Sequence, residues 1–365
     1  MSRDLSSAKV NLFLFVGNRN RRTCLHELDS VFHPVSLADE IDIQLFWESD
    51  EAKSYFKKNN SFERENNCNT FEIKINNQSL HLVLEIYFDS ELKRVLEFTG
   101  EIENKTKELL TENNLAIRSL RLFFDSLLEL DSASKIPHSV KITILKRIPV
   151  QAGLGGGSSN ASTVLRILLN EYPEKSLPTT FIPNIARVLG DDVFPCYFNT
   201  PVRYYGGQIV KLSSIIGSDF SLNGMPVIVF KPPNGVNTGD AFRLLAREDK
   251  EHNEFPDELN NRGNKALSLV RQLYSENYKI LQFNKILFDG LVNDFQAVVE
   301  AQLPVIREAR EVLADQEGNL FSLLTGSGSA LIGYFIDESL CRKAANTLRS
   351  KFEESCFISC EKLIY

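Results

Sequence analysis

One stretch of the chain combines residue types that can bind phosphate. Glycines stand at position 153 and at positions 155–157, and Ser158 and Ser159 follow them directly. Consecutive glycines leave backbone N–H groups uncovered, and the first turn of a helix adds unpaired amides and the positive end of its dipole. Such a concavity suits a phosphate group. A flexible linker or a tight packing turn is the alternative interpretation.

The patterns on either side of the glycines favour phosphate binding over a linker. Residues 140–144 alternate between apolar and polar, as in a strand, and apolar residues within 161–172 have helical spacing. We expect a helix that starts at Ser158-Ser159, with these hydroxyl residues as its cap. A Walker A loop is excluded because no lysine follows Gly157, and the dinucleotide pattern is disfavoured because it needs glycine at position 158.

Composition narrows the class of ligand. The 365 residues are 43% hydrophobic and suggest two domains, and the net charge of −7 gives no general attraction to nucleic acid or anionic lipid. We therefore expect a small-molecule substrate and no membrane span, since no run approaches the roughly 18 apolar residues that one requires. Six cysteines without a CxxC pair favour reduced thiols in a cytoplasmic protein over a disulfide framework or a zinc site.

The remaining patterns predict a mixed α and β chain that opens with strands. Residues 8–16 alternate, so Lys9 starts a strand on the side away from Val10 and Leu12. Further strands are expected at 31–37 and 41–46, separated by 38–40, and at 80–88, 140–144, 226–231, 320–324, 330–335 and near 357. Helices are expected from Asn114, over 181–189 with an end at Gly190, and near 340–352. A hairpin is expected at 204–210, a surface excursion at 48–70, and a loop at 249–264.

Several segments occur in the order found in the GHMP kinases, a family of galacto-, homoserine, mevalonate and phosphomevalonate kinases. The glycine stretch resembles the family's ATP-binding loop, and its extended form resembles the branch that phosphorylates a diphosphocytidyl-linked alcohol in non-mevalonate isoprenoid synthesis. The other matching segments are Ala8-Lys9-Val10-Asn11-Leu12-Phe13-Leu14, His26-Glu27-Leu28 with Val31-Phe32, Leu189-Gly190-Asp191-Asp192-Val193, Asn293-Asp294-Phe295 and Thr325-Gly326-Ser327-Gly328-Ser329.

The resemblance implies a fold and a nucleotide site. It implies an α+β chain of two domains, an N-terminal one like the second domain of ribosomal protein S5 and a C-terminal ferredoxin-like one, with the active site between them. The N-terminal domain would span 1–212, with an insertion near 48–110, and the C-terminal domain 213–365. ATP would be bound by Pro149, Val150, Gln151, Ala152, Gly153, Leu154, Gly155, Gly156, Gly157, Ser158, Ser159 and Asn160.

The resemblance also implies roles in phosphoryl transfer. Asp192 would accept the proton of the substrate hydroxyl, with Asp191 as a lesser candidate, and Lys9 would keep Asp192 charged and favour the developing alkoxide. Mg²⁺ is implied because a hard cation must bridge the phosphate oxygens, and Ser159 is its candidate ligand. Substrate-binding residues would be Asn11, His26, Thr325, Gly326, Ser327 and Gly328.

Two departures from the family pattern keep other functions open. The chain has Asp192-Val193-Phe194-Pro195 where the family has Asp-Val-Pro, and Leu25 where the diphosphocytidyl branch has the aromatic that would stack on cytosine. Base stacking on an aromatic is commonly worth about 1–3 kcal/mol. The alternatives are therefore a kinase for another small alcohol, such as homoserine, mevalonate or a sugar, and a non-catalytic nucleotide-binding protein.

Overall fold

The computed structural model divides the chain into two compact units, each assembled from separate stretches. Unit 1 comprises residues 1–7, 38–148 and 155–197, and unit 2 comprises 8–37, 149–154 and 198–365. The described residues are 2–19, 26–50, 54–55, 67–76, 78–172, 177–217, 222–245, 255–275, 288–352 and 354–365. The expected domain boundary after residue 212 stays a prediction.

Unit 1 is built on a sheet with helices packed against it. Strands β3 (Cys68–Ile75), β4 (Gln78–Phe88) and β5 (Ser139–Lys146) lie side by side, followed by the second half of β2 (His26–Phe46). The β3–β4 and β5–β2 pairs are antiparallel, and β4–β5 is parallel. The β4–β5 crossover carries three helices: α2 (Ser90–Phe98), α3 (Ile102–Leu109) and α4 (Leu115–Leu130).

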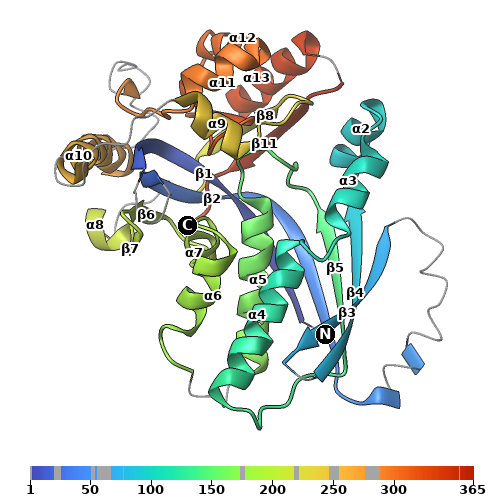
Figure 1. Ribbon diagram of the computed structural model, residues 1–365. Helices are drawn as coiled ribbons and strands as arrows, with labels where there is room; N and C mark the ends of the chain where they lie inside the picture. The colour runs from blue at the N-terminus through green and yellow to red at the C-terminus, as the bar shows by residue number, and fades with distance from the viewer. Residues whose placement is uncertain are drawn as a thin grey trace. The chain divides into compact units, whose positions relative to one another are not determined.

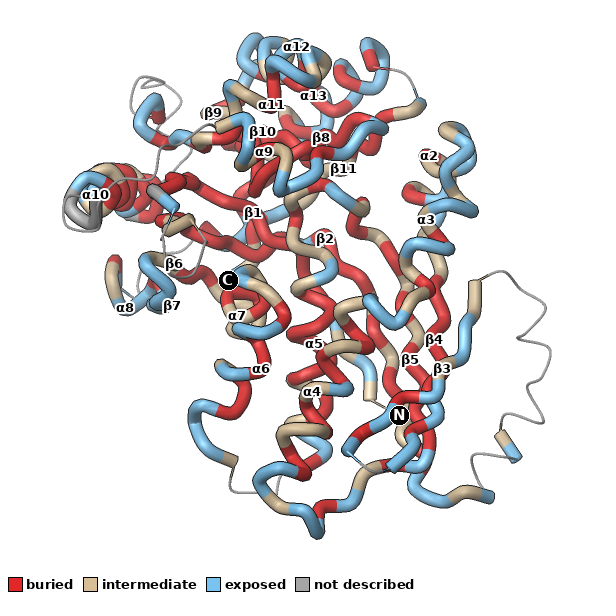
Figure 2. The backbone as a smooth tube through the Cα atoms, viewed as in Figure 1, coloured by how far each residue is buried: buried red, intermediate tan, exposed pale blue. Residues whose placement is uncertain are grey.

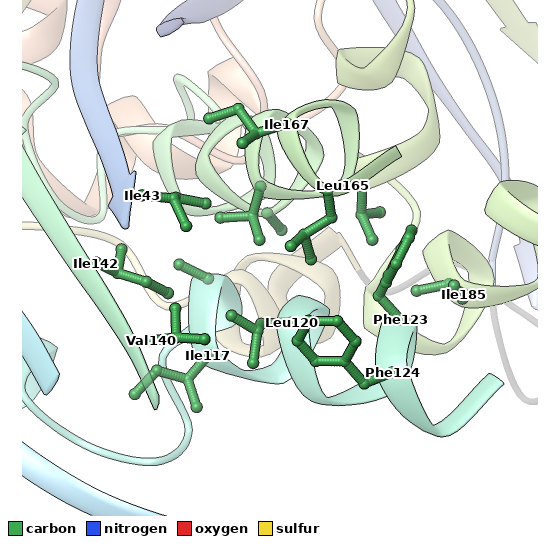
Figure 3. Close-up of a cluster of buried hydrophobic side chains, with 14 of the residues drawn as sticks. Ile43, Ile117, Leu120, Phe123, Phe124, Val140, Ile142, Leu165, Ile167 and Ile185 are labelled. Atoms are coloured by element: carbon green, nitrogen blue, oxygen red, sulfur yellow. The ribbon is translucent and has the colours of Figure 1, made fainter. Parts of the chain in front are cut away.

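The helices of unit 1 bury one apolar face each. Helices α4 and α5 (Gly156–Glu171) pack side by side (Figure 1), and α6 (Phe181–Leu189) and the short α7 (Val193–Tyr197) pack against them. Figure 3 shows the resulting core, in which the Phe123 ring lies between Leu165 of α5 and Ile185 of α6. Each large apolar side chain buried in this way stabilises the fold by about 1.5–3 kcal/mol. This core fixes α5, whose first turn follows the glycines.

Unit 2 contains two sets of strands. Residues 8–19 of β1 (Ser2–Arg19) and residues 26–37 of β2 belong to unit 2, and β1 pairs with β2. Strand β2 pairs through residues 29–32 with β6 (Val202–Tyr205), which forms a hairpin with β7 (Gln208–Lys211). The short helix α8 (Ser213–Ile216) follows β7.

The second sheet of unit 2 is antiparallel and has the order β11-β8-β10-β9. Its strands are β8 (Pro226–Lys231), β9 (Asn319–Leu324), β10 (Leu331–Phe335) and β11 (Phe357–Lys362), and β8 and β10 are buried along their whole length (Figure 2). Helix α12 (Pro304–Ala314) precedes β9, and α13 (Glu338–Lys351) connects β10 to β11. A βαββαβ chain with this strand order is the ferredoxin-like arrangement, as expected.

Three further helices of unit 2 lie between β8 and α12: α9 (Thr238–Leu245), α10 (Phe255–Ser275) and α11 (Gln296–Gln302). The prediction of a loop over 249–264 is wrong for 255–264, which belong to α10. The polar composition favours a loop, but this turn of α10 is contacted by the side chain of Arg203. Arg203 forms two hydrogen bonds with the buried Asp29, and its guanidinium also donates to Asn264.

Two other sequence predictions need correction. Residues 31–37 and 41–46 do not form separate strands, because β2 runs without a break through 38–40. Asp39 looked like a turn residue, but its carboxylate is satisfied within the protein, so the strand can continue through it. The excursion at 48–70 falls largely outside the described residues, whereas the strand expected at 80–88 is β4.

Candidate functional site

The glycine loop adopts a backbone that favours glycine. Gly153 and Gly155 have φ angles of 75° and 68°, in the left-handed region that side chains disfavour, and Gln151 has φ 55°. Gly153 is also pressed against the turn at 325–329: a Cβ atom there would lie 2.1 Å from the carbonyl oxygen of Thr325. Glycine at 153 therefore permits both the bend and the close approach of two backbones.

Backbone hydrogen bonds hold residues 152–154 on two sides. The amide of Lys9 donates to the carbonyl of Leu154 at 3.0 Å, and the amide of Ala330 donates to the carbonyl of Ala152 at 2.9 Å. Lys9, which lies inside β1 rather than at the start of a strand, and the β9–β10 turn thus fix the loop, and a shift in either would move it.

Helix α5 starts two residues earlier than predicted. Its first residue is Gly156, its N-cap is Gly155, and no side chain caps it, so the prediction of a serine cap is wrong. The left-handed Gly155 turns the chain into the helix without a side chain, and the amide of Ser159 already donates to the carbonyl of Gly155 at 2.8 Å. The N–H groups of the preceding residues of the first turn have no acceptor within the helix. They are the donors that an anion requires.

A buried ion pair stands beside this first turn in unit 1. Lys146 ends β5 and is 4% exposed, and its ammonium pairs with Asp39, which is fully buried. The other carboxylate oxygen of Asp39 accepts the amides of Arg147 and Ile148 at 2.8 and 2.9 Å. A Cβ atom on Gly156 would lie 3.5 Å from the Lys146 nitrogen, so the ammonium lies against the first residue of α5.

The local sequence does not predict this ion pair. Lys146 occupies one of the polar positions of a strand, which usually face solvent, and its partner is far away in the sequence. Asp39 fixes both the start of the loop and the position of the Lys146 ammonium.

Lys9 and Asn11 are buried in unit 2, and the structure brings both to the turn at 325–329. Lys9 is 4% exposed; its ammonium donates to the Asn11 side-chain oxygen at 2.9 Å and lies 4.9 Å from the centre of the Phe32 ring. The same Asn11 oxygen accepts the Thr325 hydroxyl at 3.1 Å and the Gly326 amide at 2.8 Å. Asn11 therefore orients the Lys9 ammonium and ties it to this turn.

The rest of this turn is held by other side chains. Asn293 donates to the carbonyls of Leu324 and Gly326, and the hydroxyls of Ser327 and Thr238 lie 3.0 Å apart. Gly328 has φ 85°, and its amide donates to the carbonyl of Thr325 at 2.9 Å. The predicted substrate-binding residues 325–328 thus form one ordered turn with Asn11.

Asp192 belongs to unit 1 and directly precedes α7. Its carbonyl accepts the amide of Cys196 at 3.1 Å, and the next carbonyl, that of Val193, accepts the Ser162 hydroxyl of α5 at 2.6 Å. Phe194 and Pro195 lie within α7, so the inserted aromatic is absorbed by the helix. Loss of surrounding water, together with the negative charge of Asp192, raises the pKa of Asp191. Joint action of Asp192 with Lys9 stays a prediction.

His26 has an aromatic neighbour that sequence analysis did not find. One ring nitrogen lies 2.8 Å from the carbonyl oxygen of Gly17, and the imidazole stacks on Phe242 of α9 with ring centres 5.0 Å apart and planes 19° apart. The two residues are far apart in the sequence, so no spacing pattern could have paired them. Leu25 lies outside the described residues.

No metal centre made of protein side chains alone is found in the described part of the chain, where no three His, Cys, Asp or Glu residues cluster. Ser159, the candidate Mg²⁺ ligand, is nearly buried in the first turn of α5, where its hydroxyl accepts a hydrogen bond from Ser6 at 2.9 Å. Within the same ranges, no helix is long and apolar enough to cross a bilayer.

The sequence is similar to those of known kinases. The family described as "GHMP kinases N terminal domain" matches residues 114–200, and "GHMP kinases C terminal" matches residues 273–354. A curated protein of Chlorobium chlorochromatii, named 4-diphosphocytidyl-2-C-methyl-D-erythritol kinase, is 32% identical over 241 residues, which cover 66% of this chain and 74% of that protein. A Porphyromonas gingivalis protein of the same name is 28% identical and covers 93% of this chain and 94% of its own length.

Solved structures share the fold. A crystal structure of 4-(cytidine 5'-diphospho)-2C-methyl-D-erythritol kinase matches with a TM-score of 0.60 at 23% identity, covering 99% of both chains. The Methanococcus jannaschii mevalonate kinase matches with a TM-score of 0.58 at 13% identity, covering 100% of this chain and 98% of that one. At these identities the likeness concerns the fold alone.

Proposed function

This chain belongs to the GHMP kinase family, and we propose that it transfers the γ-phosphate of ATP to the 2-hydroxyl of 4-diphosphocytidyl-2-C-methyl-D-erythritol. The observation that carries the choice of substrate is the 32% identity over 241 residues with a curated kinase of that name. The reaction would be a cytoplasmic step of non-mevalonate isoprenoid precursor synthesis.

The glycine stretch would bind the triphosphate. The open amides of the first turn of α5 are donors for phosphate oxygens, and the dipole of a helix of this length favours negative charge at that end. The Lys146 ammonium lies beside the same turn and adds positive charge. ATP would therefore contact residues 149–160, as the family resemblance implies.

Asp192 and Lys9 would act on the substrate hydroxyl. The hydroxyl oxygen attacks the γ-phosphorus, its proton passes to the Asp192 carboxylate, and the bond to ADP breaks. Lys9, oriented by Asn11, would stabilise the developing negative charge on the attacking oxygen. Lys9 is nearly fully buried. Its side chain is therefore already held in position before the reaction begins.

Mg²⁺ would supply charge compensation on the phosphates. A magnesium ion in a kinase is usually held by one or two protein oxygens together with phosphate oxygens. A site at which the described residues form no cluster of carboxylates therefore fits it. Ser159 is the candidate protein ligand because its hydroxyl lies in the first turn of α5.

The cytidine group would be recognised near His26. Its imidazole offers a polar edge for the base, and Phe242 supplies an aromatic ring next to it. The Phe242 ring, which is stacked on His26, would hold the imidazole in place for the base, whereas the sequence has Leu25 in place of the family's aromatic. Asn11 and the turn Thr325–Gly328 would position the substrate alcohol.

A panel of alcohols tests the proposal. The full chain is incubated with ATP, Mg²⁺ and one of the diphosphocytidyl alcohol, homoserine, mevalonate or a sugar, and ADP release is measured with phosphorus NMR of the product. We expect ADP release with the diphosphocytidyl alcohol and a new phosphomonoester signal. Faster ADP release with another alcohol would assign that substrate instead, and ATP binding without transfer to any alcohol would indicate a non-catalytic protein.

A further inference from the structure

Two cysteines face each other where the last helix packs on the last strand of the chain. Cys341 lies in the first turn of α13 and is fully buried, and Cys360 lies on β11 and is partly exposed. Both belong to unit 2, where they lie in or against its core cluster. All five cysteines of the described residues are free thiols.

The Cys360 thiol is in direct contact with residue Cys341. The Cys360 thiol donates to the backbone carbonyl of Cys341, with the sulfur 4.0 Å from that oxygen. Each thiol also changes the pKa of the other, so the two side chains lie in the same small region. A disulfide requires sulfurs about 2.05 Å apart and β-carbons roughly 3.5–4.5 Å apart. Because the Cys360 sulfur already lies against the backbone of Cys341, we expect side-chain rotation to bring the two sulfurs to this distance.

The surroundings favour a reactive thiolate on Cys360 rather than on Cys341. The hydrogen bond from Cys341 and the positive charges of Arg349 and Arg342 lower the pKa of the Cys360 thiol to about 7, against burial and the nearby charge of Glu361. The hydrogen bond to Cys360 and burial raise the pKa of Cys341. The thiolate that can meet an oxidant is thus the one that solvent reaches, and the buried thiol is its partner.

We propose that Cys341 and Cys360 are a redox-active dithiol that hydrogen peroxide converts to a reversible disulfide between α13 and β11. The Cys360 thiolate attacks one peroxide oxygen, which gives a sulfenic acid and, after protonation of the leaving hydroxide, one water. The Cys341 sulfur then attacks the Cys360 sulfur, its proton leaves with the displaced hydroxide, and a second water forms. Peroxide is reduced to two waters while two thiols are oxidised to one disulfide.

The disulfide would close a loop of residues 342–359. By the chain-entropy relation, a disulfide that closes a loop of about 20 residues stabilises the folded state. In a chain of 365 residues this should raise the midpoint of thermal unfolding by about 5 °C. Neither cysteine belongs to the proposed nucleotide loop or the turn at 325–329, so the proposal is independent of the substrate.

The test uses the reduced full-length protein. It is treated with a few equivalents of hydrogen peroxide, excess oxidant is removed with catalase, free thiols are alkylated, and the digest is analysed by mass spectrometry. We expect a cross-linked peptide pair that contains Cys341 and Cys360 and has lost two hydrogens, a rise of about 5 °C in the unfolding midpoint, and reversal of both by dithiothreitol.

Variants separate the pair from the other cysteines. Cys360→Ser should abolish the cross-link and the shift, Cys341→Ser should leave a sulfenic acid on Cys360 that dimedone traps, and the control Cys68→Ser should behave like the wild type. The inference is overturned if Cys360 is still alkylated at peroxide doses that oxidise Cys68, or if the cross-link joins other cysteines. Because the peptide map of the wild type decides alone, the result holds even if a variant does not fold.

Discussion

Replacing Gly153 by alanine tests how the loop depends on its contact with the turn at 325–329. The alanine would have to keep the φ angle of 75° that Gly153 has. This left-handed conformation costs about 1–2 kcal/mol for a residue with a side chain. The new Cβ atom would also lie 2.1 Å from the Thr325 carbonyl oxygen, so that one backbone must move by more than an ångström. Strain and displacement together amount to about 3 kcal/mol, which corresponds to roughly 100-fold in the population of the native loop.

The assay compares Gly153→Ala with Gly224→Ala, in the same unit. Gly224 has φ 86° but no atom within 4 Å of the added Cβ, so it shares the backbone strain without the contact. We expect the KM for ATP to rise roughly 100-fold in Gly153→Ala and to stay within threefold of the wild type in Gly224→Ala, measured by steady-state ADP release. If both variants keep the wild-type KM and lose the same stability, then the contact with Thr325 does not shape the nucleotide site and the reasoning is refuted.

Three further predictions concern buried charges and a buried imidazole. Lys146→Met removes the ion-pair partner of the buried Asp39, and Lys141→Met removes that of the buried Glu85. Each variant should lower the free energy of unfolding by about 3 kcal/mol. Only Lys146→Met should raise the KM for ATP, which ATP titrations of the transfer rate will measure. Lys9→Ala should lower kcat by about 100-fold or more at saturating ATP, and an unchanged kcat would contradict its role in transfer. Burial lowers the pKa of His33 from 6.5 to about 4, so the unfolded state gains a proton that the folded state does not. The free energy of unfolding should therefore fall by about 3 kcal/mol as the pH drops from about 7 to about 4, and His33→Gln should flatten this slope in urea titrations.

Local patterns were enough to predict much of the fold. The end of α6 follows from Gly190 after an amphipathic stretch, and the strands of the ferredoxin-like sheet follow from short apolar runs such as 226–231. The glycine stretch between a strand pattern and a helical pattern likewise places a helix directly after the loop. In these places local sequence and tertiary structure favour the same conformation.

The features that were missed depend on partners far apart in the sequence. Asp39 continues β2 because two amides and an ammonium from residues 146–148 satisfy it, and none of these is visible in the local pattern. The polar turn of α10 near 264 is held by Arg203. Phe242 reaches His26 across more than 200 positions, so no spacing rule pairs the two rings.

The start of α5 was misplaced for a related reason. Serines usually cap helices, but here Gly155 enters the helix in the left-handed conformation and the serines lie inside it. In a first turn with a side-chain cap, the capping oxygen would accept a hydrogen bond from a backbone amide of that turn. The difference therefore concerns function, because uncapped amides remain open to a ligand.

We propose that this chain transfers a phosphoryl group with Asp192 as the proton acceptor. The most direct measurement is a single-turnover experiment with ATP, Mg²⁺ and the diphosphocytidyl alcohol, comparing the wild type with Asp192→Asn by rapid quenching. Asparagine keeps the size of the side chain and cannot accept the proton, so the rate of transfer should fall by about 100-fold or more while the dissociation constant for ATP stays within threefold. A rate within tenfold of the wild type would contradict this role of Asp192.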